Sequence, residues 1–215
     1  MKTGIIFDLD GTLLDTLEDL ADSVNYILRE NGCPERSLGE VRAMVGNGVR
    51  NLMLQALSPD KKGQVDEILP AFRAYYGTHS QIKTRPYPGI PEALEKLAKE
   101  YPMAVASNKP DAMVKPLCRE HFGEIYALGE RAECPRKPAP DMVYAVMKAL
   151  GVERCVYVGD SEVDLETAAN AGVPCLSVLW GFRDREVLEK AGGKYFCGDP
   201  GELYDRIKSI IENEE

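Results

Sequence analysis

The sequence predicts an α/β protein: a doubly wound, Rossmann-like parallel sheet interrupted by an all-helical insert. A short apolar, strand-like run opens the chain at 3–9 and ends in acidic residues. From Pro91 onward, short apolar runs alternate with amphipathic helical segments, as in a parallel sheet with helices on both faces. Residues 15–85 are helical in pattern and contain no convincing strand. We therefore predict a core of 1–14 and 86–215 and an inserted helical domain of 15–85.

The insert is expected to contain four helices. They are predicted at 17–28, in a short segment after residue 37, at 49–57 and at 61–80. Asp15 followed by Glu18 predicts a capping box at the first helix, and Ser37 followed by Glu40 predicts another at the second. Pro70 predicts a kink or a new start within the fourth helix, because proline cannot donate the backbone hydrogen bond.

The core begins with one strand and resumes after 85–89, a segment with two prolines that is expected to be a linker. Later strands are predicted at 103–107, 124–128, 155–158, 174–180 and 194–197. Helices are predicted at 91–99, 111–121, 141–150, 162–171, 183–191 and 202–212. Pro140 before the third of these helices and Gly151 after it support both of its boundaries.

The composition excludes several classes of function. The chain has 26 basic and 35 acidic residues, a net charge of −9, which argues against binding to nucleic acid or to an anionic membrane. The longest apolar run, 142–147, is far shorter than a membrane span, and no signal-peptide pattern opens the chain. Six cysteines show no metal-binding spacing. We expect a cytoplasmic protein with reduced thiols, either a monomer or a homodimer.

Polar and charged side chains follow several predicted strands, at the carboxyl ends where a doubly wound sheet binds ligands. They are Asp8, Asp10, Gly11 and Thr12 after the first strand, Ser107 and Asn108 after the second, Lys137 before the helix at 141–150, and Asp160 and Asp164 after the strand at 155–158. Four carboxylates, a hydroxyl and an ammonium group are therefore expected at one edge of the sheet.

Four carboxylates in one crevice repel one another and need a cation. One divalent ion together with the Lys137 ammonium would leave a single net negative charge. Ligand sets made only of oxygen favour Mg²⁺ over zinc or copper, and Mg²⁺ readily shares the oxygens of a substrate phosphate. The pattern therefore predicts Mg²⁺ as the cofactor and a small phosphorylated metabolite as the substrate.

These groups predict a phosphoryl-transfer mechanism. A bound cation lets a carboxylate attack a phosphate dianion that would otherwise repel it. We expect Asp8 to be the nucleophile and to form an aspartyl phosphate. Asp10 is expected to protonate the leaving alkoxide and then to deprotonate the water that attacks the intermediate. The expected phosphate-binding residues are Gly11, Thr12, Ser107, Asn108 and Lys137.

Four segments resemble, in chain order, the four motifs of the haloacid dehalogenase-like hydrolase superfamily: 8–12, 107–108, 137–138 and 159–164. The resemblance covers almost the whole chain, including a helical cap inserted after the first motif. It implies that Mg²⁺ is bound by the Asp8 carboxylate, the Asp10 backbone carbonyl and Asp160. It also implies that Asp164 supports the metal site indirectly, by contacting the residues around the ion or through a water molecule.

Within this superfamily the chain resembles the phosphoglycolate phosphatases at 46–50, 107–110 and 137–141. This resemblance implies hydrolysis of 2-phosphoglycolate to glycolate and phosphate. A phosphatase for another small ester or for pyrophosphate is the main alternative. A sugar phosphomutase is disfavoured because Leu20 stands where those relatives carry a histidine. A 2-haloacid dehalogenase is disfavoured because members with that activity lack the second acid, which is Asp10 in this chain. A phospho-accepting receiver module would have no helical insert.

In the predicted cap, the turn at 46–48 either only separates two helices or binds the substrate. In the second interpretation Asn47, Gly48 and Arg50 set the specificity, because an arginine can bind a substrate carboxylate through two hydrogen bonds. Outside the motifs, we expect Lys109 on the surface or steering phosphate. The segment 180–182 is expected to pack in the core.

Overall fold

The structure is a computed structural model, and it describes residues 2–213. The chain forms two compact units. One unit, here called the core unit, consists of Met1–Leu14 and Pro86–Glu215. The other, called the helical unit, consists of Asp15–Arg85. Strands β2 (Leu14–Asp15) and β3 (Arg85–Pro86) pair where the chain passes from one unit to the other.

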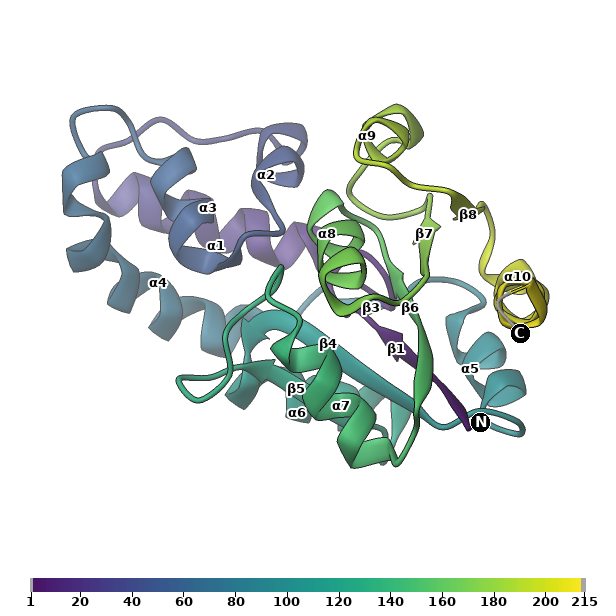
Figure 1. Cartoon of the computed structure of the whole chain (residues 1–215). Coiled ribbons are helices and arrows are strands. Elements are labelled where there is room, and N and C mark those ends of the chain that lie inside the picture. The colour runs from purple at the N-terminus through teal and green to yellow at the C-terminus, as the bar shows by residue number, and fades with distance from the viewer. Residues whose placement is uncertain (1, 214–215) are drawn as a thin grey trace. The chain divides into compact units, whose positions relative to one another are not determined.

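The core unit is built on a six-stranded parallel sheet. Its strand order is β5-β4-β1-β6-β7-β8. The strands are β1 (Thr3–Phe7), β4 (Met103–Pro110), β5 (Tyr126–Glu130), β6 (Arg154–Gly159), β7 (Cys175–Val178) and β8 (Tyr195–Cys197). Strand β1 lies between β4 and β6 (Figure 1), and Ile5 faces Met103 on one side and Val156 on the other. The predicted doubly wound α/β fold is confirmed.

Helices cover both faces of this sheet, because successive side chains of a strand point to opposite sides. Ile5 and Phe7 of β1 belong to one buried cluster, with helices α5 (Ile90–Leu97), α6 (Asp111–Phe122) and α10 (Leu203–Asn213). Ile6 belongs to the other cluster. That face carries α7 (Asp141–Leu150), α8 (Glu162–Ala171) and α9 (Arg185–Lys190). A short 3-10 turn, Pro200–Glu202, precedes α10.

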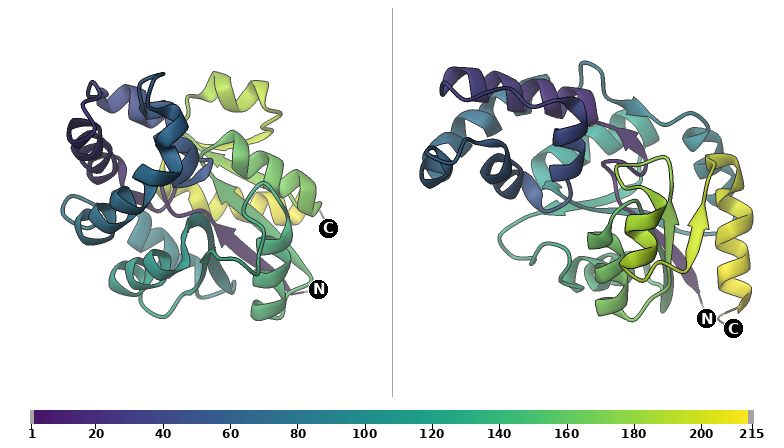
Figure 2. Two further views of the ribbon diagram at one scale, coloured as in Figure 1. Left: turned by 90° about the vertical axis from the view of Figure 1, so that its left-hand side faces the viewer. Right: turned by 90° about the horizontal axis from the view of Figure 1, so that it is seen from above.

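The helical unit contains α1 (Leu17–Glu30), α2 (Leu38–Met44), α3 (Gly48–Ala56), the 3-10 turn Lys62–Gln64 and α4 (Val65–His79). Helix α1 packs against α4, and the rings of Tyr26 and Tyr75 stack with their centroids 3.8 Å apart. His79 extends this stack at 3.9 Å from Tyr75. Both views in Figure 2 show the helices of this unit gathered together.

Local signals predicted some boundaries correctly and others wrongly. The Ser37–Glu40 capping box is present at α2, but the box predicted for Asp15 and Glu18 is not, since Thr16 occupies the N-cap position of α1. Asp15 instead accepts a hydrogen bond from the backbone of Leu17 (3.3 Å). Pro70 lies within α4 without ending it, because a proline removes one helical hydrogen bond while the neighbouring ones remain.

Two further findings bear on the class of protein. Among the helices of residues 2–213, none has both the length and the apolar character needed to span a bilayer. All six cysteines are free thiols with buried side chains. They therefore act as small apolar groups in the packing.

Candidate active site

The predicted functional residues of the core unit gather at the carboxyl ends of β1, β4 and β6. Asp8 follows β1, Ser107 lies in the last half of β4, and Asp160 follows β6. After β1 the chain adds β4 and β5 on one side of β1, and it then adds β6, β7 and β8 on the other side (Figure 1). The strand order therefore reverses next to β1. A doubly wound sheet opens a ligand-binding crevice at this point.

Three carboxylates form the centre of this site. Three carboxylate oxygens lie within 4.8 Å of one another, one each from Asp8, Asp160 and Asp164. All three side chains are nearly or fully buried. Burial raises the pKa of Asp8 to about 7, with the Lys137 ammonium opposing the shift and Asp164 adding to it. Burial, with Asp164 and Asp8 beside it, raises the pKa of Asp160 well above its ordinary value. The buried carboxylates therefore repel one another, and a cation between them would stabilise their charged forms.

Lys137 supplies part of that charge. Its Nζ lies 2.9 Å from Asp8 Oδ1 and 2.7 Å from Asp164 Oδ1, and its side chain is 2 % exposed. Burial disfavours the ammonium, but Asp164 and Asp8 outweigh it and hold the pKa of Lys137 well above its usual value. Lys137 is therefore charged and lies beside the predicted nucleophile.

Asp160 is held by loops on either side of it. Its Oδ1 accepts a hydrogen bond from the Thr12 hydroxyl (3.3 Å), and its Oδ2 accepts one from the backbone N–H of Phe182 (2.7 Å). Two glycines make this approach possible, because a Cβ at Gly11 or Gly181 would collide with the Asp160 side chain. Gly11 also has a φ of +83°, a conformation that other residues rarely adopt.

Asp164 is bound on both of its oxygens. Its Oδ2 accepts hydrogen bonds from the hydroxyl (2.6 Å) and the backbone N–H (3.1 Å) of Ser161, in a capping box at the start of α8. Its Oδ1 accepts from Lys137 Nζ and, at 3.3 Å, from the Tyr157 hydroxyl. The carboxylate thus fixes Lys137 to the N-terminus of α8, a position from which it can support a metal site without binding the ion directly.

Asp10 has a partner that the sequence analysis missed. Lys109 Nζ lies 2.9 Å from Asp10 Oδ1, and the lysine side chain is only 3 % exposed. The expectation of a surface position for Lys109 is therefore wrong. Strand β4 continues to Pro110, beyond its predicted end, and carries Lys109 into the site. Counted with Asp8, Asp160 and Asp164, the four carboxylates face two ammonium groups, which leaves two negative charges.

The other predicted phosphate-binding residues make protein contacts. Asn108 accepts a hydrogen bond from the Lys137 backbone N–H (2.8 Å) and donates one to the Lys137 carbonyl (2.9 Å), so it holds the loop that carries the lysine. The Ser107 hydroxyl accepts from the Lys109 N–H (3.2 Å). The Gly11 N–H donates to the Leu14 carbonyl (2.9 Å). Phosphate binding by these residues and by Thr12 stays a prediction.

The predicted specificity residues lie in the helical unit, at the start of α3. Gly46 and Gly48 both have positive φ values, 123° and 76°, so the turn around Asn47 requires glycine on either side. The Arg50 guanidinium forms two 2.7 Å hydrogen bonds with the Asp66 carboxylate of α4, on the exposed surface. Substrate binding by Asn47, Gly48 and Arg50 stays a prediction.

Two further contributors were not found from the sequence. The segment after β7, expected only to pack in the core, donates hydrogen bonds from Phe182 to Asp160 and from the Trp180 indole to the Thr12 carbonyl (3.0 Å). Tyr157 of β6 contacts Lys137 through its hydroxyl (3.0 Å). A tyrosine within an otherwise aliphatic buried run was the available signal, because a buried hydroxyl needs a partner.

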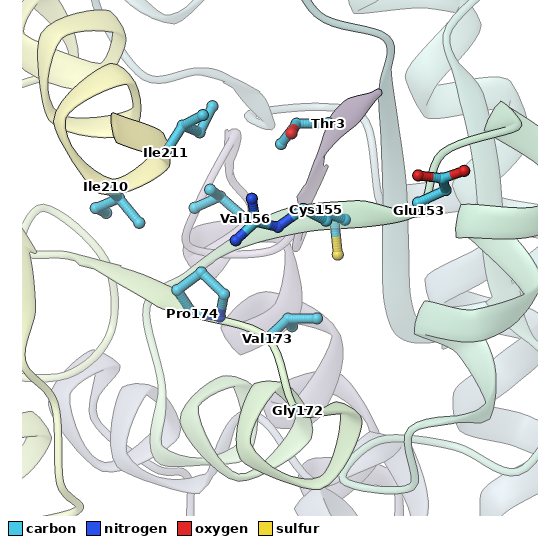
Figure 3. A pocket seen from close by; sticks show the side chains of 10 residues that line it. Thr3, Glu153, Cys155, Val156, Gly172, Val173, Pro174, Ile210 and Ile211 are labelled. Atoms are coloured by element: carbon cyan, nitrogen blue, oxygen red, sulfur yellow. The ribbon is translucent and has the colours of Figure 1, made fainter. Parts of the chain in front are cut away.

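A small pocket lies at the opposite, amino ends of β1 and β6. Figure 3 shows it beside α10, with Thr3, Cys155 and Ile210 among the lining residues; its volume is about 140 Å³. Burial raises the pKa of the Cys155 thiol to about 12, so the thiol is not a nucleophile at neutral pH. The charged groups of the core unit described above lie at the other end of these strands.

Comparison with known proteins identifies the family. Residues 5–178 match the model of the haloacid dehalogenase-like hydrolases. The chain belongs to this family. The resemblance found in the sequence is thus confirmed, and so is the prediction that the protein is an enzyme. The matched region contains the carboxylates and the lysine described above.

Several relatives of the chain are named phosphoglycolate phosphatases. The enzyme of that name from Pseudomonas savastanoi pv. phaseolicola is 39 % identical over 96 % of this chain and 78 % of its own length. That from Mesorhizobium japonicum is 34 % identical over 86 % of each chain. A crystal structure from Lactobacillus delbrueckii subsp. bulgaricus, provisionally assigned as a phosphoglycolate phosphatase, superimposes with a TM-score of 0.90 at 35 % identity, covering 96 % of this chain and 99 % of that one.

The core unit can accommodate a metal ion. The oxygens of Asp8, Asp160 and Asp164 are close enough to share one cation, and Asp8 Oδ1 is buried with no well-aligned hydrogen bond, although Lys137 lies near it. A divalent ion would cancel the two negative charges left by the four carboxylates and two lysines. The oxygen-only set matches hard cations such as Mg²⁺ or Ca²⁺.

Proposed function

We propose that this enzyme is a Mg²⁺-dependent phosphatase of small phosphomonoesters that works through an aspartyl-phosphate intermediate. The observation that carries the proposal is the buried Asp8 carboxylate, at the ligand-binding edge of the sheet, with Lys137 Nζ 2.9 Å away and two further carboxylates beside it. The names of the relatives support the same activity.

The metal site of the proposal consists of the Asp8 carboxylate, the Asp10 backbone carbonyl and Asp160. Asp164 supports it indirectly, since both of its oxygens already accept hydrogen bonds from protein groups. When bound, Mg²⁺ supplies positive charge that offsets the repulsion between a carboxylate nucleophile and a phosphate dianion. The residues of the chain perform the remaining steps.

In the first step of the proposed reaction, an Asp8 oxygen attacks the phosphorus atom. The bond from phosphorus to the ester oxygen breaks, and Asp10 gives its proton to the leaving alkoxide. Lys137 stabilises the charge on the transferring phosphoryl oxygens. In the second step, Asp10 takes a proton from a water molecule that attacks the phosphorus. The bond from phosphorus to Asp8 then breaks, which regenerates the carboxylate and releases inorganic phosphate.

We propose 2-phosphoglycolate as the substrate, hydrolysed to glycolate and phosphate. Relatives including those from P. savastanoi and M. japonicum carry that activity in their names. In this proposal Arg50 exchanges its Asp66 partner for the substrate carboxylate, while Asn47 and Gly48 shape the turn. The free state of all six cysteines supports a cytoplasmic location.

The proposal is tested by a phosphate-release assay of the full chain with Mg²⁺. The screen includes 2-phosphoglycolate, sugar phosphates, pyrophosphate and p-nitrophenyl phosphate. We expect the highest kcat/KM for 2-phosphoglycolate, and a loss of more than about 10³-fold in Asp8→Asn, because loss of a covalent nucleophile is among the most severe changes in an enzyme. Absence of phosphate release from every compound would overturn the proposed function, whereas preference for another ester would overturn only the substrate.

The same measurements separate the alternatives. Retention of the phosphoryl group on Asp8 without turnover would indicate a receiver module, and its transfer back to a second sugar hydroxyl would indicate a phosphomutase. Release of halide from a 2-haloacid without metal would indicate a dehalogenase. The presence of Asp10 argues for the phosphatase, because a dehalogenase has no leaving alkoxide to protonate and needs no second acid.

A further inference from the structure

Tyr157 lies close to the reacting groups without being part of the motifs. It is in β6, three residues before Asp160, and its side chain is fully buried. It points to the sheet face that is covered by α7 and α8, because it belongs to the buried cluster of that face. Lys137, in the loop before α7, and Asp164, in α8, approach the site from the same face.

The Tyr157 hydroxyl joins three parts of the site. It accepts a hydrogen bond from Lys137 Nζ (3.0 Å) and can donate to the Ala106 carbonyl (3.2 Å) or to Asp164 Oδ1 (3.3 Å). Ala106 immediately precedes Ser107, so the hydroxyl connects the lysine to the end of β4. A hydroxyl has one hydrogen and two lone pairs, which suits one acceptor role and one donor role here.

The Lys137 ammonium donates two hydrogen bonds, to Asp164 Oδ1 and to the Tyr157 hydroxyl, while Asp8 Oδ1 lies 2.9 Å away without a well-aligned hydrogen bond. The group has three N–H donors, and its near neighbours are Asp164 Oδ1, Tyr157 Oη and Asp8 Oδ1. The Asp8 contact is the one that changes when Asp8 carries a phosphoryl group. Tyr157 and Asp164 are therefore the two hydrogen-bond acceptors of Nζ that do not react in the proposed mechanism.

Packing alone does not explain a tyrosine at this position. A phenylalanine would fill the same space with no polar atom, whereas burying a hydroxyl is unfavourable unless it is hydrogen-bonded. The neighbours of Tyr157 in β6 are Val156 and Val158, both buried. Apolar packing therefore does not account for the hydroxyl, whereas its hydrogen bond with the Lys137 ammonium does.

We propose that Tyr157 is a positioning residue, which holds the Lys137 ammonium at the place where the phosphoryl oxygens of the transition state form. This inference rests on the proposed function. Small misplacements of a catalytic group cost much rate even when binding is unaffected. Loss of the hydroxyl should therefore reduce kcat and leave KM nearly unchanged.

The test is Tyr157→Phe, which removes only the hydroxyl. We expect kcat for the best substrate of the screen to fall about 10- to 100-fold, with KM within about twofold of the wild type. A crystal structure of the variant should show Lys137 Nζ displaced from its position beside Asp8. Tyr157→Leu removes the same hydroxyl with a different shape, and a comparable loss of kcat would assign the effect to the hydroxyl rather than to packing.

The matched control is Tyr76→Phe, the same chemical change at a tyrosine of α4 that is 2 % exposed. It should keep the wild-type kcat and KM. Wild-type kcat in Tyr157→Phe, or a lower kcat with Lys137 unmoved in the crystal, would overturn the inference. If the wild type hydrolyses none of the esters, the proposed function fails, and the position of Nζ in the variant crystal still decides whether Tyr157 holds the lysine.

Discussion

The two units use charged residues in opposite ways. In the core unit, Lys137, Asp8 and Asp164 are buried together, and the pKa values of Asp8 and Lys137 shift strongly. In the helical unit, Arg50 and Asp66 form a pair with good geometry, yet their side chains are 48 % and 68 % exposed. Water and salt screen the second pair much more strongly than the first. The same kind of ionic contact thus accompanies strongly shifted pKa values in one unit and is a weak surface interaction in the other.

The largest effect in this comparison is expected at the Asp10–Lys109 pair of the core unit. Asp10→Asn should lower kcat about 10²- to 10⁴-fold, because the amide can neither give nor take the proton in the proposed steps. Lys109→Met should lower kcat by a smaller factor, about tenfold, because Asp10 keeps its chemistry but loses the partner that orients it. Steady-state kinetics with thermal melts checks both.

Both variants should melt close to the wild type, since the site lies at the edge of the sheet. Gross unfolding of Asp10→Asn would show that the residue is structural, and wild-type kcat would remove it from the mechanism. A loss in Lys109→Met equal to that in Asp10→Asn would mean that the lysine does more than orient the acid.

A second prediction concerns pH and metal. Because the pKa of Asp8 rises from 3.8 to about 7 on folding, the folded chain holds this proton more tightly than the unfolded chain. The protonated Asp8 therefore favours folding, and this contribution is fully present below about pH 4. It is lost as the pH rises to about 7, which lowers the free energy of unfolding by at most about 4 kcal/mol. Without metal, the free energy of unfolding should therefore fall across this range.

Denaturant unfolding in EDTA and in Mg²⁺ measures this effect, with Asp8→Asn as the matched control. Mg²⁺ should stabilise the protein more at pH 7.5 than at pH 5, because protons and the metal compete for the same carboxylates. Asp8→Asn should lose part of the pH dependence. Identical curves for wild type and variant, or no stabilisation by Mg²⁺ at either pH, would show that these carboxylates do not form a titrating metal site.

The smallest effect is expected in the helical unit. Arg50→Ala and Asp66→Asn should each change the free energy of unfolding by less than about 1 kcal/mol, because the pair is exposed. If Arg50 binds the substrate carboxylate, Arg50→Ala raises KM about tenfold for 2-phosphoglycolate and much less for p-nitrophenyl phosphate. Asp66→Asn, which keeps the arginine, should not raise KM. Equal effects on both substrates would remove Arg50 from specificity.

The sequence predicted those parts of the fold that depend on local signals. Helices α7 and α8 occupy the predicted ranges, because an N-terminal proline or serine and a C-terminal glycine bound each of them. The capping box at Ser37 formed, whereas Asp15 did not cap α1 because pairing in β2 takes it before the helix starts. Local patterns are reliable where no distant segment competes for the same residue.

The candidate site divides in the same way. Asp8, Asp160 and Lys137 could be predicted because each follows a strand or precedes a helix at a known edge of a parallel sheet. Lys109 could not, because its burial depends on where β4 ends. Phe182 could not either, since its backbone reaches Asp160 only after β7 has paired with β6. Such contacts join residues that are tens to about a hundred positions apart.

By itself, the sequence determined the class of fold, the family and the residue types gathered at the edge of the sheet, because hydrophobic periodicity and strand-end motifs are local properties of the chain. Only the tertiary structure decided which charges are paired and how deeply. It brought Lys109 to Asp10 and Tyr157 to Lys137, and it left Arg50 on an exposed surface with Asp66. Pairing and burial depend on distances between segments remote in sequence, and these exist only once the sheet and its helices have packed.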